Sequence, residues 1–159
     1  MHRSTLLALA TLLTVVLPAP DALGADASVA SRLDARGVKY EVDEDGDYRV
    51  TIRYSDEGRT QLAFVSGRTE SVSGLRVREV FAPAGRVDRD GIDGAKALEL
   101  LRESRRQKIG SWEIGGSVLY FVIKLPDSAD AAELEAALDI VAQVADDKEI
   151  ELSGDTDEL

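Results

Sequence analysis

The sequence contains no cysteine, and its one histidine, His2, stands at the start of the chain. Without cysteine the protein can be neither a disulfide scaffold nor a thiol enzyme. If His2 is removed on export, a Ser-His-Asp triad and a typical zinc site are excluded as well. Carboxylate, lysine, hydroxyl and tyrosine chemistry remains. These absences favour a protein that binds, and we predict no enzymatic activity, no catalytic residue, no metal and no cofactor.

The first residues follow the order of a secretory signal peptide. Arg3 gives a positive start, residues 6–17 form an apolar run, and two prolines and several small residues follow. The run has 12 residues, whereas a helix needs about 20 to span a bilayer. We predict cleavage between Gly24 and Ala25, with cleavage after Ala27 as the alternative. The product would be periplasmic or secreted, without a stable membrane anchor.

The net charge of −11 is concentrated at the C-terminal end of the sequence. Residues 127–159 hold twelve acids and one base, whereas the acids and bases of residues 1–126 balance. This acidic surface would repel phosphates, so we predict no nucleic-acid partner. It could meet a basic partner or only keep the protein in solution.

Chain length and composition indicate one domain. Removal of residues 1–24 leaves 135 residues, which suits a single hydrophobic core. We predict a signal peptide over residues 1–24, one α+β domain over residues 25–154 and a flexible acidic tail over residues 155–159.

Hydrophobic periodicity predicts helices and strands in the order α-β-β-β-β-α-β-β-α. Adjacent antiparallel strands with helices against one face would make an α+β sandwich. The helices are expected over residues 28–36, 95–106 and after a cap at Asp127 or Ser128. The strands are expected over residues 38–42, 48–54, 61–66, 75–82, 108–114 and 117–125.

Some of these elements carry expectations about the direction of their side chains. Leu98 and Leu101 are expected on the inward face of the second helix, and Leu75 and Val77 on the inward face of the fourth strand, with an irregularity near Glu79. Residues 118–123 are apolar on both faces, which is typical of a strand inside the sheet and covered on both sides.

The end of the last helix carries an unfavourable charge pattern. Four acids crowd its C-terminal end, where the helix dipole is already negative. We predict that this end either frays or contacts arginines of the preceding helix. The acids are Asp146, Asp147, Glu149 and Glu151, and the arginines are Arg102, Arg105 and Arg106.

Two acidic loops leave a calcium-binding module open as an alternative. Residues 43–47 and 88–94 are rich in aspartate and glycine, but neither has the ligand spacing of a calcium loop. An envelope enzyme that uses paired carboxylates is a further alternative, although the sequence singles out no such pair. Both loops are more simply read as turns.

The aromatic residues all fall on predicted strands, where they are expected to pack in the core. If some of them line an exposed face of the sheet instead, they would form a peptide-binding surface. Trp112 and Tyr120, on facing strands, are the candidate pair for binding a partner.

Several short motifs together resemble the YbjN family, also called the bacterial sensory transduction regulators. They are a helix that ends at Gly37, YEVDEDGD at residues 40–47, LAFV at 62–65, and IGSW at 109–112. The resemblance implies a fold similar to the type III secretion chaperones, small acidic homodimers that bind extended segments of other proteins. It brings no catalytic residues. The chaperones work in the cytosol, so their secretion role does not transfer to an exported chain. We therefore expect an exported, non-enzymatic homodimer that binds a protein or peptide partner.

Overall fold

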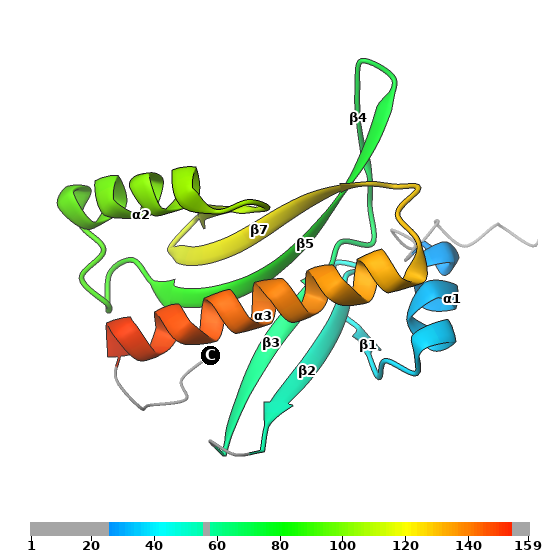
Figure 1. The fold of residues 1–159 in the computed structure, drawn as a ribbon, viewed down its shortest axis with the longest axis horizontal. Coiled ribbons are helices and arrows are strands. Elements are labelled where there is room, and N and C mark those ends of the chain that lie inside the picture. The colour runs from blue at the N-terminus through cyan, green and yellow to red at the C-terminus, as the bar shows by residue number, and fades with distance from the viewer. Residues whose placement is uncertain (1–25, 56–57, 154–159) are drawn as a thin grey trace, which may run out of the picture.

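The computed structural model describes residues 26–55 and 58–153. The expected signal peptide with its cleavage site at Gly24 and Ala25, and the expected acidic tail, lie outside the described residues. Within them the chain forms three helices and a seven-stranded antiparallel sheet (Figure 1), which confirms the α+β class.

The elements follow the predicted order with one additional strand. The last helix begins later than expected and is capped by Asp130, not by Asp127 or Ser128, because Oδ1 of Asp130 accepts hydrogen bonds from the backbones of Ala132 and Glu133 at 2.9 Å. The strand order across the sheet is β1-β2-β3-β5-β7-β6, and β4 pairs with β5 alone. The helices are α1 (Ala27–Arg36), α2 (Gly94–Arg106) and α3 (Ala131–Ser153). The strands are β1 (Glu41–Val42), β2 (Tyr48–Tyr54), β3 (Arg59–Val65), β4 (Glu70–Val72), β5 (Leu75–Arg86), β6 (Ser111–Gly115) and β7 (Val118–Pro126).

Helix α1 ends as its sequence predicts and begins one residue earlier than expected. Asp26 is its N-cap, because an oxygen of its carboxylate accepts a hydrogen bond from the backbone of Ser28 at 2.9 Å. Gly37 ends the helix in the left-handed backbone conformation (φ 71°). Val29 and Leu33, one turn apart, face the core.

The unexpected strand β4 forms a projecting hairpin with β5. Ser73 and Gly74 connect the two strands with φ of 50° and 87°, the left-handed pattern of a tight hairpin turn. Because the hairpin projects from the domain, Leu75 is 71% exposed and Val77 is only half-buried. The expectation that both face inward is therefore wrong.

Strand β5 continues four residues beyond its predicted end. Its register against β7 shifts between Pro83 and Gly85, not near Glu79 as expected. Proline has no N–H to donate, so an irregularity of pairing is a place where a strand tolerates it. This continuation brings Arg86, at the end of β5, to the edge of the groove described below.

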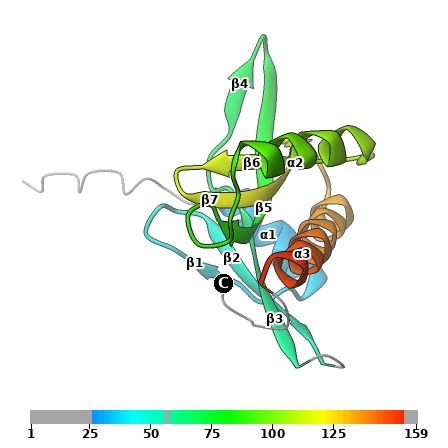
Figure 2. The same cartoon turned by 90° about the vertical axis from the view of Figure 1, so that its left-hand side faces the viewer.

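The helices cover only one of the two faces of the sheet. Helices α1 and α3 lie against it on the same side (Figure 2). On that side Leu119, Phe121 and Ile123 of β7 are fully buried. On the other side Val118 and Tyr120 are half-buried, and no helix among the described residues covers them. β7 thus lies inside the sheet as predicted, but the expected second cover is absent from the described chain.

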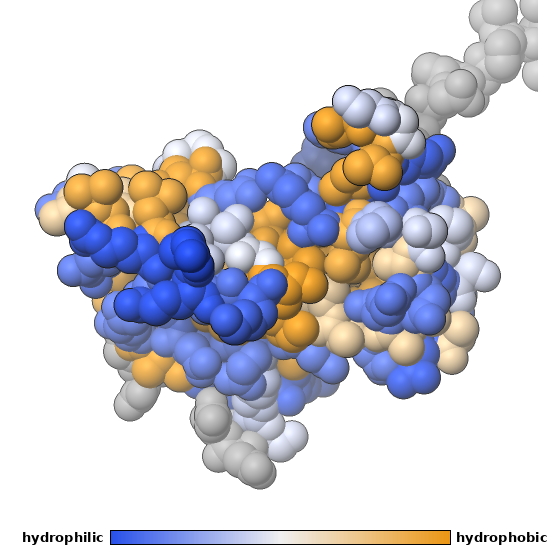
Figure 3. Space-filling model, turned by 45° about the horizontal axis from the view of Figure 1, so that its top comes forward, coloured by the Kyte–Doolittle hydropathy of each residue, from blue (hydrophilic) through white to orange (hydrophobic). Residues whose placement is uncertain are grey.

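Helix α2 presents a different face from the one expected. Leu100 is buried, whereas Leu98 and Leu101 are 54% and 62% exposed. The orientation follows from Ser104, one turn after Leu100, whose hydroxyl accepts a hydrogen bond from the backbone of Trp112 at 2.9 Å. Figure 3 shows apolar side chains on the surface of α2 as a result, separated from those of the β4–β5 hairpin.

The acidic end of α3 is helical to Ser153, and two of its four acids pair with an arginine that the sequence does not predict. Arg59 of β3 contacts both Asp146 and Glu149 at 2.9 and 3.1 Å. All three side chains are buried. The arginines expected in this role are at exposed positions of α2: Arg102, Arg105 and Arg106.

Candidate binding groove

The uncovered face of the sheet is apolar along its centre. Strand pairing places Phe64 of β3 opposite Phe81 of β5, and Phe81 opposite Val122 of β7. One step along, Pro83 lies opposite Tyr120. Directly opposed residues share a face, so these side chains form one continuous surface.

Three aromatic rings make contact across this face. Phe64 and Phe81 are stacked, with ring centroids 5.2 Å apart and planes 7° from parallel. Tyr120 meets Phe81 edge to face at 5.8 Å. Both geometries are favourable for aromatic pairs. The rings therefore hold one another in place and form a preorganised apolar floor.

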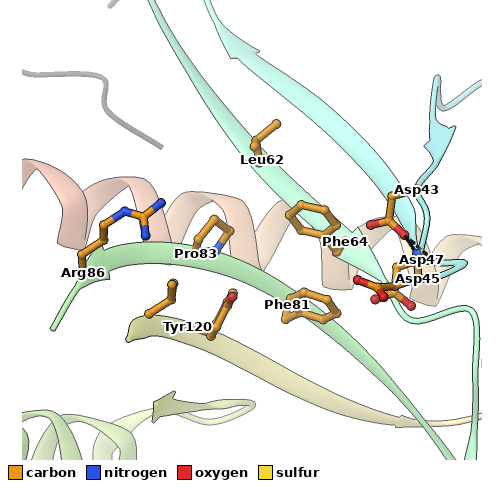
Figure 4. Close-up of a pocket in the computed structure, with 10 residues that line it drawn as sticks. Asp43, Asp45, Asp47, Leu62, Phe64, Phe81, Pro83, Arg86 and Tyr120 are labelled. Carbon is orange, nitrogen blue, oxygen red and sulfur yellow. Dashed lines mark hydrogen bonds between the residues drawn. The ribbon is translucent and has the colours of Figure 1, made fainter. Parts of the chain in front are cut away.

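This floor belongs to a groove of about 470 Å³, which we call the aromatic groove (Figure 4). Its floor is made by Leu62, Phe64, Phe81, Pro83, Val118 and Tyr120. Its two ends differ in charge, with three aspartates at one end and Arg86 at the other.

The acidic end is shaped by the turn between β1 and β2. Oδ1 of Asp43 accepts hydrogen bonds from the backbones of Asp45 and Asp47 at 3.0 and 2.9 Å, and Asp47 Oδ1 accepts one from Gly67 at 2.9 Å. Burial raises the pKa of Asp47, and the carboxylates of Asp43 and Asp45 raise it further, although the Gly67 hydrogen bond opposes this. The turn therefore brings three acids close together beside the groove.

The basic end lies where β5 ends. The backbone N–H of Arg86 donates to Asp90 at 2.6 Å, and the Asp90 carboxylate also accepts two hydrogen bonds from the Arg89 side chain. Asp90 is thus occupied by the turn that follows the strand. The Arg86 guanidinium is exposed and lines the groove.

Trp112 and Tyr120 do not form one surface. Trp112 pairs with Phe121 across the strands, whereas Tyr120 pairs with Glu113, so the two side chains lie on opposite faces. Trp112 is 6% exposed and meets Phe121 edge to face at 5.0 Å. Tyr120 alone lies on the uncovered face, in the aromatic groove.

A hydrogen bond to α2 and a cation–π contact with α3 also fix Trp112 in the core. Its Nε1 donates to Glu103 of α2 at 3.0 Å, and Nζ of Lys148 on α3 lies 5.7 Å from its ring centroid. Lys148 in turn forms a 3.0 Å ion pair with Glu103. The only sequence signal for the groove is local: Phe64, Phe81 and Tyr120 are each flanked along the strand by core residues.

The aspartates of the two acidic loops have structural roles. Asp43 and Asp47 organise the first loop, as described above, and in the second Asp93 caps α2 through hydrogen bonds to two backbone N–H groups. No group of three or more Asp, Glu, His or Cys residues within residues 26–55 and 58–153 has a placement suited to a metal ion.

No protein-family model matches the chain, and no curated protein matches it. The resemblance to the YbjN family therefore stays a prediction. Among the described helices none is both long enough and apolar enough to cross a membrane.

Proposed function

We propose that this protein is an exported, non-enzymatic binding domain of the YbjN type that holds an extended segment of a partner protein in the aromatic groove. The observation that carries the proposal is β7, whose side chains are apolar on both faces while helices cover only one. Strands of this composition are normally covered on both sides. A bound segment would supply the second cover.

The chemistry of the groove favours binding over hydrolysis. Glycoside hydrolysis needs one carboxylic acid to donate a proton and a second carboxylate on the other side of the bond. Asp43 accepts hydrogen bonds from backbone N–H groups of its own turn, Asp47 accepts one from Gly67 after β3, and Arg86 lies at the opposite end of the groove. The alternative of a carboxylate enzyme therefore gains no support from this site.

The proposal includes a homodimer that uses a different surface. Leu101 of α2 lines a shallow pocket with Ile114 of β6, the edge strand of the sheet, where Ile114 is 50% exposed, and Leu98 is exposed about one turn earlier on the same helix. An exposed apolar patch next to an edge strand is a common site of association. A dimer formed there would leave the aromatic groove open, because the groove is on the other face.

A peptide of alternating pattern tests the binding function. The probe is Ser-Val-Thr-Phe-Thr-Leu-Ser with blocked ends and a fluorescent label, whose three apolar side chains share one face when the peptide is extended. We expect saturable binding to the full chain, weakened about tenfold by Tyr120→Ala, a loss of about 1.4 kcal/mol.

The matched control is Val72→Ala, which removes an exposed apolar side chain of the β4–β5 hairpin, outside the groove. This variant should bind as the wild type does. Binding that is equally strong in Tyr120→Ala, with its thermal unfolding unchanged, would show that the groove is not the binding site.

A further inference from the structure

We infer that the aromatic groove selects segments by charge as well as by apolarity: a basic residue at the aspartate end, alternating large apolar residues along the floor, and an acidic group at the Arg86 end. This inference rests on the proposed function and names the chemistry of its ligand. It is carried by the opposite charges at the two ends of one apolar groove (Figure 4).

The groove runs along β5, which fixes the length of segment that it fits. Phe81 lies near the aspartates, Pro83 lies opposite Tyr120, and Arg86 ends the strand. The strand rises roughly 3.3 Å per residue, so the distance from Phe81 to Arg86 is roughly 16 Å. An extended segment of about five residues covers this length, with one charged residue beyond each end.

The aspartate end has a surplus of negative charge. The charges of Asp43 and Asp45 both raise the pKa of Asp47, and the opposing charge of Arg68 is a smaller influence on it than either. Asp45 is exposed and forms no ion pair among the described residues. A lysine or arginine of a bound segment would relieve the mutual repulsion of these carboxylates.

The Arg86 end has an exposed guanidinium, whose charge is the last of the causes that lower the pKa of Asp90. Among the described residues it forms no ion pair, and the nearby Asp90 is engaged by Arg89 at 2.6 Å. A guanidinium can bind a carboxylate through two parallel hydrogen bonds. An acidic side chain or a chain-terminal carboxylate is therefore the group that suits this end.

The hollow shape of the groove favours a single segment over a second copy of the protein. A second copy packed face to face would present the same hollow, so the two grooves would enclose a void between them. An extended segment instead places side chains into the groove and fills it. The unfilled volume would cost a face-to-face dimer its packing contacts.

Five peptides with the core Val-Thr-Phe-Thr-Leu test the inference with the full chain. At the N-terminal and C-terminal ends, in that order, the peptides carry Lys and Glu, Glu and Lys, Lys and Lys, Glu and Glu, or Ser and Ser. Fluorescence anisotropy at low salt measures their affinity. Both mixed peptides are included because the bound peptide can run in either direction along the groove. We expect the better mixed peptide to bind at least about fivefold more tightly than the Glu-ended one.

Charge-reversed variants give the decisive arm of the experiment. Arg86→Glu makes both ends acidic, so it should prefer the peptide with two lysines to either mixed peptide. Asp45→Lys should weaken the mixed peptides and bind the Glu-ended peptide more tightly than the wild type does. Both residues are exposed and form no ion pair among the described residues, so both variants should remain folded, which thermal unfolding checks. The preferences should fade in high salt, which screens exposed charges.

The outcomes separate this inference from the proposed function. Equal affinity for all five peptides, with Tyr120→Ala still weakening each of them, overturns the charge selection and leaves the binding function intact. If none of the peptides shows binding that Tyr120→Ala weakens, both the inference and the proposed function are overturned. Dissociation of a dimer on addition of peptide, seen by light scattering, would identify a second copy as the natural occupant and overturn the inference.

Discussion

Arg59 of β3 donates a hydrogen bond from Nε to Oδ1 of Asp146 on α3 across 2.9 Å, although 87 residues separate them in the sequence. The two side chains are 7% and 1% exposed. The same guanidinium reaches Oε2 of Glu149 one helical turn later. At the acidic end of α3, one arginine from the sheet thus pairs with two of the four acids, while Lys96 and Lys148 pair with Glu151.

Replacing Arg59 by methionine should destabilise the protein strongly. The change leaves two buried carboxylates without their cation, and breaking a buried ion pair in this way costs roughly 3–5 kcal/mol. Urea unfolding followed by circular dichroism measures the loss.

Arg53→Met provides the control, because Arg53 is an exposed arginine of the neighbouring strand β2. It should shift the free energy of unfolding by less than about 0.5 kcal/mol. If Arg59→Met costs no more than this control, Arg59 does not hold the end of α3.

The contrast between α1 and α3 shows what the sequence could and could not predict. The cap at the end of α1 is local, so glycine at position 37 was sufficient to place it. The partner of Asp146 is distant, and the pattern around α3 only showed that some cation was needed. Arginines of α2 were nearer in sequence, but their helix lies over the edge strand β6 with those side chains exposed.

In the sheet, too, the sequence predicts local features but not contacts between distant segments. Alternation along each strand revealed which residues share a face, but it could not show which face the helices would cover. Trp112 and Tyr120 lie on facing strands, yet a register offset of one residue puts them on opposite faces. The row of Phe64, Phe81 and Tyr120 emerges only when strands from three parts of the chain are in register.

Asp26 should make stability depend on pH in the acidic range. The hydrogen bond from the Ser28 backbone lowers the pKa of Asp26 below its usual 3.8, and the nearby Arg78 acts in the same direction. A lowered pKa in the folded state stabilises the protein above the usual value. This contribution is lost as the pH falls through the folded-state pKa.

Asp26→Asn keeps the capping geometry and removes the charge, so it isolates this effect. We expect the variant to be less stable than the wild type at pH 6 and equally stable well below the pH at which Asp26 is protonated. Thermal unfolding over this range tests it. A stability difference that stays constant at every pH would contradict the assignment.

Asp26 also bears on the expected signal cleavage. Cleavage after Ala27 would remove the N-cap of α1, the 2.5 Å ion-pair partner of Arg78 and the acceptor of the Tyr48 hydroxyl hydrogen bond. Arg78 is 1% exposed, so losing one of its two carboxylate partners would be costly. We therefore expect cleavage between Gly24 and Ala25. Intact mass measurement of the exported protein decides between the two sites, and a mature chain that begins at Ser28 would refute the expectation.

The proposed homodimer should depend on the apolar surface of α2. Leu98→Ser with Leu101→Ser should convert a dimer at micromolar concentration into a monomer, as measured by light scattering after size exclusion. The control is Val72→Ser with Leu75→Ser, an equally exposed apolar pair on the β4–β5 hairpin. A wild-type protein that is strictly monomeric would count against the dimer, and a dimer that survives the α2 changes would place its interface elsewhere.

Trp112 should report on the core and not on the bound segment. It is the single tryptophan of the chain and is 6% exposed, so its fluorescence should be shifted to the blue and resist quenching by iodide. Because it lies on the face opposite the aromatic groove, saturation with peptide should leave its emission unchanged while the peptide's anisotropy rises. Glu103→Gln, which weakens the hydrogen bond to Nε1, should shift the emission without changing peptide affinity. A peptide-dependent shift of Trp112 emission in the wild type would mean that the segment binds on the helical side of the sheet.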